Sequence, residues 1–95
     1  MTITKSVTFI AKEGSEEKMK ELLSAMVVPS KAEMGCLFYE IFQYENDRKR
    51  FMAVETWENE VALNAHKTSA HYALYKSSYE PFCEDKYTDE LEVLK

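Results

Sequence analysis

The stretch ETWENEVALNAHKTSAH, residues 55–71, carries the side chains best suited to chemistry, because it contains the only tryptophan and both histidines of the chain. An imidazole titrates near neutral pH and can act as a general acid or base. An indole ring offers a large apolar wall and one N–H donor. These residue types predict either the rim of an active-site pocket or a tightly packed corner between a strand and a helix.

His66 is the candidate for proton transfer. Small or apolar residues lie about one helical turn before and after it, namely Ala62, Leu63, Ser69 and Ala70. They leave space beside the imidazole on the inward face of a helix. Two interpretations stay open, a hydrogen-bonded core histidine or a general acid or base that faces a cavity.

His71 follows His66 by five residues, which is about 140° around an unbroken helix at 3.6 residues per turn. The two imidazoles would then not share a face as the ligands of an i, i+4 metal pair do. No cysteine pair or carboxylate cluster stands nearby to complete a tetrahedral set. We therefore predict no metal site and a supporting role for His71. Two glycines cannot form a dinucleotide-binding loop, so no cofactor is expected either.

Trp57 ends a predicted strand, and side-chain alternation places it on the same face as Phe51, Ala53 and Glu55. Trp57 is either a core residue or a wall of an aromatic pocket. A buried carboxylate without a partner is costly, so Glu55 should lie at a cavity edge or accept a hydrogen bond. Further candidates for contact with a ligand are Tyr39, Asn64 and Tyr72.

Hydrophobic periodicity and turn residues divide the chain into elements. The predicted strands span residues 3–11, 36–45, 50–57 and 86–94, and the predicted helices span residues 15–28, 60–67 and 70–79. The first helix either ends at Val28 or continues, kinked at Pro29, to Met34. The expected helix N-caps are Ser15, Asn59, and either Thr68 or Ser69.

The order β-α-β-β-α-β predicts an α+β domain of the ferredoxin-like class, whose helices cover one face of a four-stranded antiparallel sheet. A chain of 95 residues supports a single domain, residues 1–95. Residues 36–45 and 50–57 carry apolar side chains on both faces, so the face without helices needs a cover that one chain lacks. We therefore expect a homodimer that packs sheet face to sheet face.

Composition disfavours several partners. The net charge is −5, and residues 80–95 hold six acids against two lysines, whereas nucleic acid is bound by clustered Lys and Arg. Apolar runs of about four residues are far shorter than the roughly 20 of a membrane span. We expect a cytoplasmic protein without a nucleic-acid or membrane partner, in which Cys36 and Cys83 are free thiols.

Several short motifs follow one another in this element order: Gly35-Cys36 with Tyr39, Glu55-x-Trp57, Ala62-Leu63-x-x-His66, and Ser69-x-His71. Together they resemble the antibiotic biosynthesis monooxygenase family over nearly the whole chain. The resemblance implies a dimeric α+β barrel. Several family members oxidise phenols or quinols with O₂ without metal or flavin, so the expected substrate is a small aromatic or quinol-type molecule.

The resemblance also implies roles for single residues. His66 would transfer a proton, and Trp57 would stack against the substrate or donate a hydrogen bond to it. The pocket of this fold lies between sheet and helices, so Trp57 and His66 would form two walls of one cavity. Val7 and Phe9 would line it as well, if their strand face points inward.

Other chemistries of the superfamily fit less well. Haem-degrading relatives use an asparagine on the first strand, where Val7 stands here. A branch that isomerises a phosphorylated sugar needs cationic groups, and Lys67 is the only nearby candidate on the helix. Two alternatives to a cofactor-independent monooxygenase stay open: a non-catalytic dimeric binding or stress-response protein of the same fold, and an isomerase that uses His66 as a proton shuttle.

Overall fold

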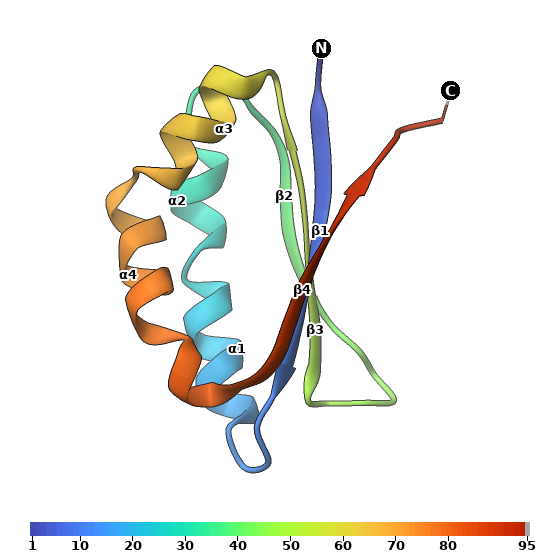
Figure 1. The fold of residues 1–95 in the computed structure, drawn as a ribbon. Helices are drawn as coiled ribbons and strands as arrows, with labels where there is room; N and C mark the ends of the chain where they lie inside the picture. Colours follow the sequence, from blue (N-terminus) through green and yellow to red (C-terminus); the bar gives the residue numbers. More distant parts are fainter. Residues whose placement is uncertain (95) are drawn as a thin grey trace.

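The computed structural model describes residues 1–94, and its elements follow the predicted β-α-β-β-α-β plan (Figure 1). The strands are β1 (Ile3–Ala11), β2 (Cys36–Gln43), β3 (Arg50–Trp57) and β4 (Cys83–Leu91). The helices are α1 (Glu16–Ser24), α2 (Val27–Lys31), α3 (Glu60–Lys67) and α4 (Ala70–Ser78), followed by the 3-10 turn η1 (Glu80–Phe82). The prediction of an α+β ferredoxin-like domain is confirmed.

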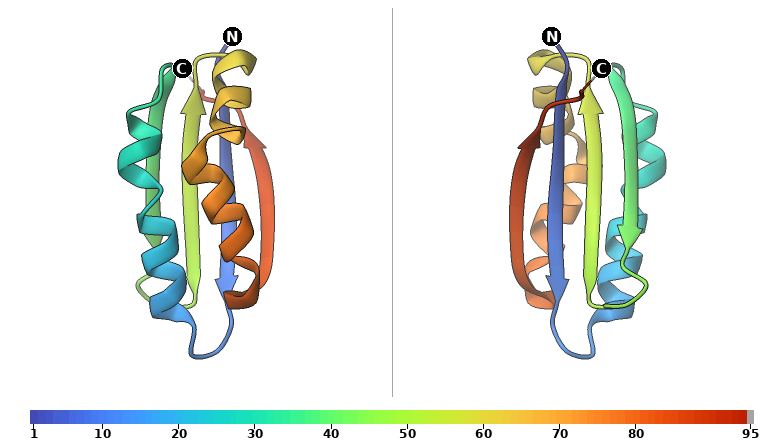
Figure 2. Two further views of the ribbon diagram at one scale, coloured as in Figure 1. Left: turned by 90° about the vertical axis from the view of Figure 1, so that its left-hand side faces the viewer. Right: turned by 90° about the vertical axis from the view of Figure 1, so that its right-hand side faces the viewer.

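The strands form one antiparallel sheet in the order β2-β3-β1-β4. The helices cover one face of this sheet and leave the other face bare (Figure 2). Exposure alternates along β3, where every second side chain, from Phe51 to Trp57, is buried. Trp57 and Glu55 therefore share the helix-covered face, as the alternation predicts.

The first helical segment is broken earlier than predicted. α1 begins at Glu16 and the helix is interrupted at Ala25–Met26, before Pro29 rather than at it. Pro29 is the third residue of α2, where its missing N–H removes no helical hydrogen bond. Ser15 occupies the N-cap position of α1, but its side chain makes no capping hydrogen bond, so that predicted cap is wrong.

α3 and α4 are two separate short helices, each with its own capping side chain. Asn59 Oδ1 accepts a hydrogen bond from the Ala62 N–H at 2.9 Å. Ser69 Oγ accepts one from the Tyr72 N–H at 3.3 Å. Both predicted caps are confirmed. Because the chain turns between the two helices, one continuous helical period does not relate the two histidines.

β4 begins and ends three residues earlier than the predicted strand. On the helix-covered face, Lys86 lies opposite Phe9 and Thr88 lies opposite Val7. Tyr87 lies between them and points to the bare face. The pairing of β4 with β1 thus places Lys86 on the inner surface of the domain.

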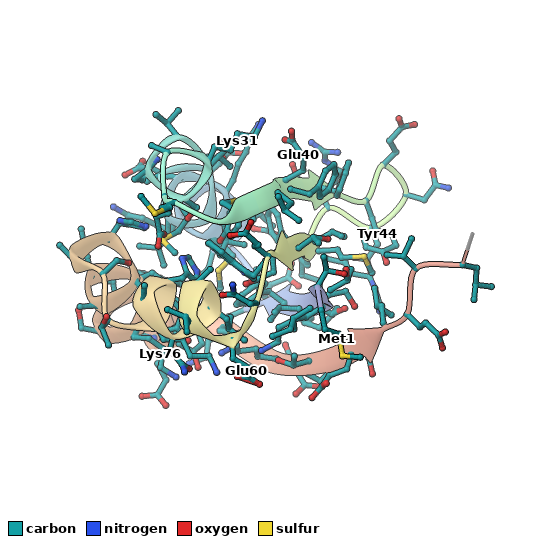
Figure 3. All side chains as sticks on the ribbon, turned by 90° about the horizontal axis from the view of Figure 1, so that it is seen from above. Met1, Lys31, Glu40, Tyr44, Glu60 and Lys76 are labelled. Carbon is teal, nitrogen blue, oxygen red and sulfur yellow. The ribbon has the colours of Figure 1, made fainter. Side chains whose placement is uncertain are left out.

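The core fills the space between the sheet and the helices (Figure 3). Its largest fully buried side chains include Phe51, Trp57, Met19 and Leu23. The Lys31–Glu40 ion pair at 2.6 Å joins α2 to β2 at the surface (Figure 3), where such a pair contributes at most about 1 kcal/mol. Apolar packing therefore holds the layers together.

Two further sequence expectations concern thiols and membranes. Cys36 and Cys83 lie on the two edge strands as free thiols, as predicted. Within residues 1–94, no helix combines the length and the apolar character needed to cross a membrane.

Gly35 fixes how closely α3 approaches the loop before β2. Its φ of +85° lies in the left-handed region that favours glycine. A Cβ at this position would lie 2.6 Å from the Cβ of Ala62. The carbonyl of Gly35 accepts a hydrogen bond from the Glu58 N–H at 2.8 Å. The loop that follows α2 is thus held directly against the start of α3.

Replacing Gly35 with alanine should lower the free energy of unfolding by about 2–4 kcal/mol, because backbone strain and a steric clash add. Gly14→Ala is the matched control. Its φ is +82°, but no atom lies within 4 Å of an added Cβ, so strain alone should cost about 1 kcal/mol. Urea unfolding followed by circular dichroism measures both. Equal losses in the two variants would contradict this account of Gly35.

Candidate active site

A cavity of about 70 Å³ lies between the sheet and the helices. Six residues that the sequence singles out line it together: Val7, Phe9, Tyr39, Glu55, His66 and Tyr72. They come from β1, β2, β3, α3 and α4, so the cavity is assembled from elements far apart in the sequence. The condition set for Val7 and Phe9 is met, since their face of β1 points to the cavity.

Two predicted site residues do not line the cavity. Trp57 has an exposed fraction of 0%, and its ring lies against the His66 imidazole with the centroids 4.5 Å apart. No ligand fits between them, so the expectation that they form two walls of one cavity is wrong. Asn64 is exposed, because the buried face of α3 carries Leu63 and His66 and the intervening positions turn outward. Asn64 therefore stays a predicted ligand contact that lies outside this cavity.

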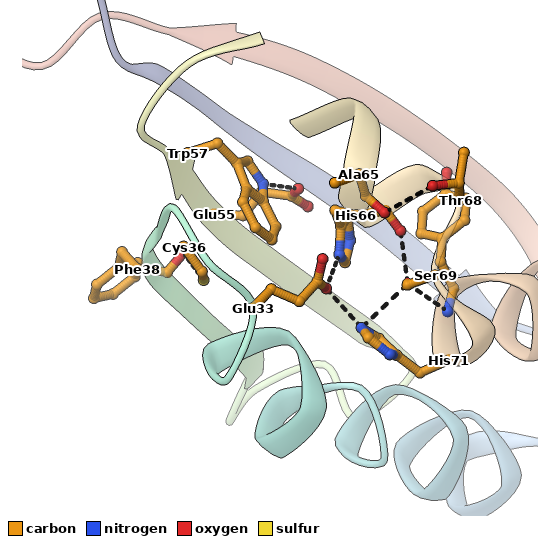
Figure 4. A network of polar contacts seen from close by, with 11 residues as sticks. Glu33, Cys36, Phe38, Glu55, Trp57, Ala65, His66, Thr68, Ser69 and His71 are labelled. Carbon is orange, nitrogen blue, oxygen red and sulfur yellow. Dashed lines mark hydrogen bonds and ion pairs between the residues drawn. The ribbon is translucent and has the colours of Figure 1, made fainter. Parts of the chain in front are cut away.

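Glu33, which the sequence did not single out, joins the two histidines (Figure 4). Its Oε2 lies 2.6 Å from Nδ1 of His66 and 2.6 Å from Nε2 of His71. The prediction that the two imidazoles point apart is wrong, because the helix breaks at Thr68 and α4 returns the His71 ring to the same carboxylate. The only sequence signal for Glu33 is its place just before the left-handed Gly35.

The shared carboxylate oxygen fixes where the protons lie. An ionised carboxylate only accepts hydrogen bonds, so both imidazole nitrogens that face Glu33 are N–H donors. The Ser69 hydroxyl donates to the His66 carbonyl at 2.7 Å and therefore accepts at its contact with His71 Nε2, 3.2 Å away. His66 thus donates from Nδ1, and whenever the ring is neutral its lone pair is on Nε2.

His66 lines the cavity, and its Nε2 has no hydrogen-bond partner among the described residues. This nitrogen is not among the fully enclosed polar atoms of this part of the chain. The rings of Trp57, Tyr39 and Tyr72 surround the imidazole, with centroid distances of 4.5, 5.7 and 5.1 Å. The site therefore holds the imidazole in one orientation, with Nδ1 engaged by Glu33 and Nε2 without a protein partner among the described residues.

Glu33, His66 and His71 are also the residues of the described chain that could hold a metal ion, since their ligand atoms lie within 4.8 Å of one another. The two N···O distances of 2.6 Å are those of strong hydrogen bonds. Ligand atoms bonded at about 2.1 Å in a tetrahedral site stand roughly 3.4 Å apart. The three side chains would have to move apart to bind an ion. In this structure they are joined by two hydrogen bonds to one carboxylate oxygen.

Glu55 is buried in the cavity wall with a hydrogen-bond partner. Its Oε1 accepts a hydrogen bond from Trp57 Nε1 at 2.7 Å (Figure 4). This contact offsets the cost of burying the carboxylate. Both sequence alternatives for Glu55, the cavity edge and the hydrogen bond, hold at once. The indole N–H is thereby engaged within the protein and does not point at a ligand.

The tyrosines of the cavity are neutral donors at physiological pH. Burial raises the pKa of Tyr39 far above its ordinary value, and the nearby Glu55 carboxylate adds to the shift. Burial also raises the pKa of Tyr72 and Tyr75. A neutral phenol keeps its O–H, so these side chains can donate hydrogen bonds to a bound molecule.

Trp57→Phe should destabilise the protein by about 2–3 kcal/mol, because it leaves the buried Glu55 carboxylate without its donor. The double variant Trp57→Phe/Glu55→Gln should recover part of this loss, since no charge is then left unpaired. Urea unfolding of both single variants and the double variant gives the coupling between the two sites. Strictly additive losses would contradict a hydrogen bond that stabilises the fold.

The fold and the site define a small α+β ferredoxin-like domain with a histidine at the wall of an aromatic cavity. The family model for antibiotic biosynthesis monooxygenase matches residues 2–77. The chain therefore belongs to the antibiotic biosynthesis monooxygenase family, and the resemblance inferred from its motifs is confirmed.

Individual relatives agree with this assignment. Rv0793 of Mycobacterium tuberculosis, a candidate monooxygenase by its name, is 29% identical over 69 residues, which cover 73% of this chain and 67% of that protein. YcnE of Bacillus subtilis, named in the same way, is 34% identical over 59 residues, 59% of this chain and 62% of that protein. The crystal structure of PA3566 from Pseudomonas aeruginosa has a TM-score of 0.94 at 31% identity, covering 99% of this chain and 95% of that chain.

Proposed function

We propose that this protein is a cofactor-independent monooxygenase that oxidises a small quinol or polyphenol with O₂. The observation that carries the proposal is the His66 imidazole at the cavity wall, whose Nδ1 lies 2.6 Å from Glu33 while its Nε2 makes no hydrogen bond to a described residue. Membership of the family and the relatives named as candidate monooxygenases support the class of reaction. The free thiols of Cys36 and Cys83 fit a reducing cytoplasmic setting.

The chemistry begins with removal of a proton. His66 Nε2 accepts the proton of a phenolic hydroxyl, and Glu33 stabilises the imidazolium through the Nδ1–H bond. The phenolate gives up an electron more readily than the phenol and passes one to O₂. The two radicals combine at a ring carbon that bears a hydrogen, and the resulting peroxide anion takes the proton back from the His66 imidazolium to form a hydroperoxide. Loss of water then leaves a ring carbonyl, so that one oxygen atom enters the product and the other leaves in water with two hydrogen atoms of the substrate.

The surrounding residues position the ring and exclude water. Val7 and Phe9 form apolar walls on β1, and Tyr39 and Tyr72 add neutral hydroxyl groups. An enclosed site strengthens the electrostatic contact between the phenolate and the imidazolium. Orientation of the ring near the base lowers the entropic cost of proton transfer. The protein thus supplies deprotonation, orientation and shielding, and the substrate supplies the electrons.

His66→Ala should reduce kcat for O₂ consumption by about 10²- to 10⁴-fold, which is the usual contribution of a positioned general base. The measurement is O₂ uptake in an oxygen electrode with a panel of one-ring hydroquinones. Glu33→Gln should lower kcat about tenfold or more with little change in KM, because it disturbs the orientation of the base. Val61→Ala, at an exposed position of the same helix, should behave as the wild type.

Other outcomes would favour other functions. Turnover of a substrate under anaerobic conditions that still requires His66 would instead support an isomerase. A non-catalytic binding protein would be supported if panel members bind but none is turned over. In that case His66→Ala would leave the background rate of O₂ uptake unchanged. Either result would rule out the monooxygenase.

We also propose that the bare sheet face forms a homodimer. Its outward side chains include large apolar groups from three strands: Phe38, Phe42, Met52, Val54, Tyr87 and Leu91. Phe38 and Phe42 are 44% and 50% exposed in the single chain. Exposed large apolar side chains gathered on one sheet face are typical of a surface that contacts a partner. A second copy of the same face is its natural cover, because a two-fold axis makes the patch self-complementary.

Phe42→Lys should shift the protein from dimer to monomer, since it places a charge among the exposed apolar side chains of the bare face. Light scattering coupled to size-exclusion chromatography should give twice the 11.1 kDa chain mass for the wild type and the single chain mass for the variant. Val61→Lys, on exposed α3, should stay dimeric. A wild-type protein that runs as a monomer at about 100 μM, in the range of weak association, would contradict the proposed interface.

A further inference from the structure

We propose that the substrate carries a carboxylate on its single phenolic ring, and that Lys86, together with Lys5 and Lys67, binds this anionic group. The phenolic ring rests on the proposed function, whereas the negative charge rests on the lysines alone. The sequence pointed to Lys67 only, and the folded chain adds two more cations to the same cavity.

The three lysines reach the cavity from three different elements, namely β1, α3 and β4. None of them forms an ion pair with a residue in 1–94. Glu55 is the one carboxylate among the described residues that line the cavity, and it accepts the indole N–H of Trp57. Glu90 stands opposite Lys5 in the β1–β4 register, but it is exposed and does not line the cavity. The cavity of this acidic protein therefore has an excess of positive charge.

Lys86 is held over aromatic rings rather than beside an acid. Its Nζ lies 5.9, 5.6 and 5.0 Å from the ring centroids of Phe9, Tyr75 and Tyr79, which are distances of cation–π contact. Burial lowers the pKa of Lys86, and the charge of Lys76 acts in the same direction. A bound anion would favour the charged amine and offset both effects.

The positions of the charged groups separate the two ends of a ligand. Lys86 lies on β4, at one edge of the sheet, whereas Tyr39, whose ring packs beside His66, lies on β2 at the other edge. A ring placed between them would direct its carboxylate toward the lysines and its hydroxyl toward His66 Nε2. Nearby cations also stabilise a phenolate, which assists the transfer of its proton to the base.

The size of the cavity restricts the ligand to one ring. Its volume of about 70 Å³ is smaller than the roughly 150 Å³ cavity that accepts benzene in another protein. The flexible side chains of Lys67 and Lys86 must therefore move as the ligand enters. A polycyclic acid would require displacement of the packed Phe9 and Tyr75, whose rings are in edge-to-face contact.

The test compares a pair of ligands that differ in charge and share a ring, 2,5-dihydroxybenzoate and its methyl ester, by titration calorimetry without oxygen. The wild type should bind the acid at least about tenfold more tightly than the ester, a difference that one charge contact can supply. Lys86→Met should reduce this preference to within about threefold and leave affinity for the ester unchanged, whereas Lys86→Arg should retain the preference. Circular dichroism verifies that each variant is folded.

Lys76→Met is the matched control, because Lys76 also lies over the Tyr79 ring, at 6.0 Å, but does not line the cavity. It should keep the wild-type preference. Equal affinity of the wild type for acid and ester, or a preference that Lys86→Met leaves intact, would overturn the inference. If the protein consumes oxygen with equal kcat/KM for the acid and the ester, the anion site is rejected and the proposal of a monooxygenase is retained. A charge preference that requires Lys86, without any oxygen uptake, would support the anion site and reject the monooxygenase.

Discussion

One carboxylate oxygen, Oε2 of Glu33, receives two imidazoles from two helices, and the arrangement of the site depends on this contact. The contact requires that the loop after α2 be pressed onto α3, which Gly35 permits because it has no Cβ to strike Ala62. It also requires the break between α3 and α4, where Ser69 is the N-cap of α4. The same features that pack the helices on the sheet therefore orient His66. The orientation of the His66 imidazole thus follows from the fold rather than from an isolated motif.

The sheet serves two purposes through its two faces. On the helix-covered face, apolar side chains alternate with a few polar ones, Lys5, Glu55 and Lys86, which would be costly to bury in an ordinary core. Their cost is reduced by the Trp57 hydrogen bond, by aromatic rings and by access to a cavity. On the bare face, exposed aromatic side chains mark a surface suited to a second copy. Rigid strands thus position the charged groups while the opposite surface is free for assembly.

Local patterns were sufficient to predict much of this structure. Side-chain alternation predicted β1 and β3, and the caps Asn59 and Ser69 predicted the starts of α3 and α4. The inward faces of these four elements carry most of the predicted cavity residues. Glu33 could not be found in this way, because its partners lie 33 and 38 positions away and meet it only through tertiary packing. Lys86 was missed because the register between the last strand and β1, which decides the face of Lys86, could not be predicted from the sequence. Trp57 was predicted to line the cavity because its strand face could be derived from the sequence. That His66 packs directly on the indole ring could not be derived in this way.

The central claim is that Glu33 holds His66 with its proton on Nδ1 and its lone pair on Nε2. Long-range ¹H–¹⁵N correlation NMR of the imidazoles near neutral pH measures this directly, since it assigns the protonated nitrogen of each ring. The account predicts that His66 is the Nδ1–H tautomer, with Nε2 unprotonated in the wild type. A His66 ring protonated on Nε2 alone would contradict it, because the nitrogen that faces the cavity could not then accept a proton from a substrate.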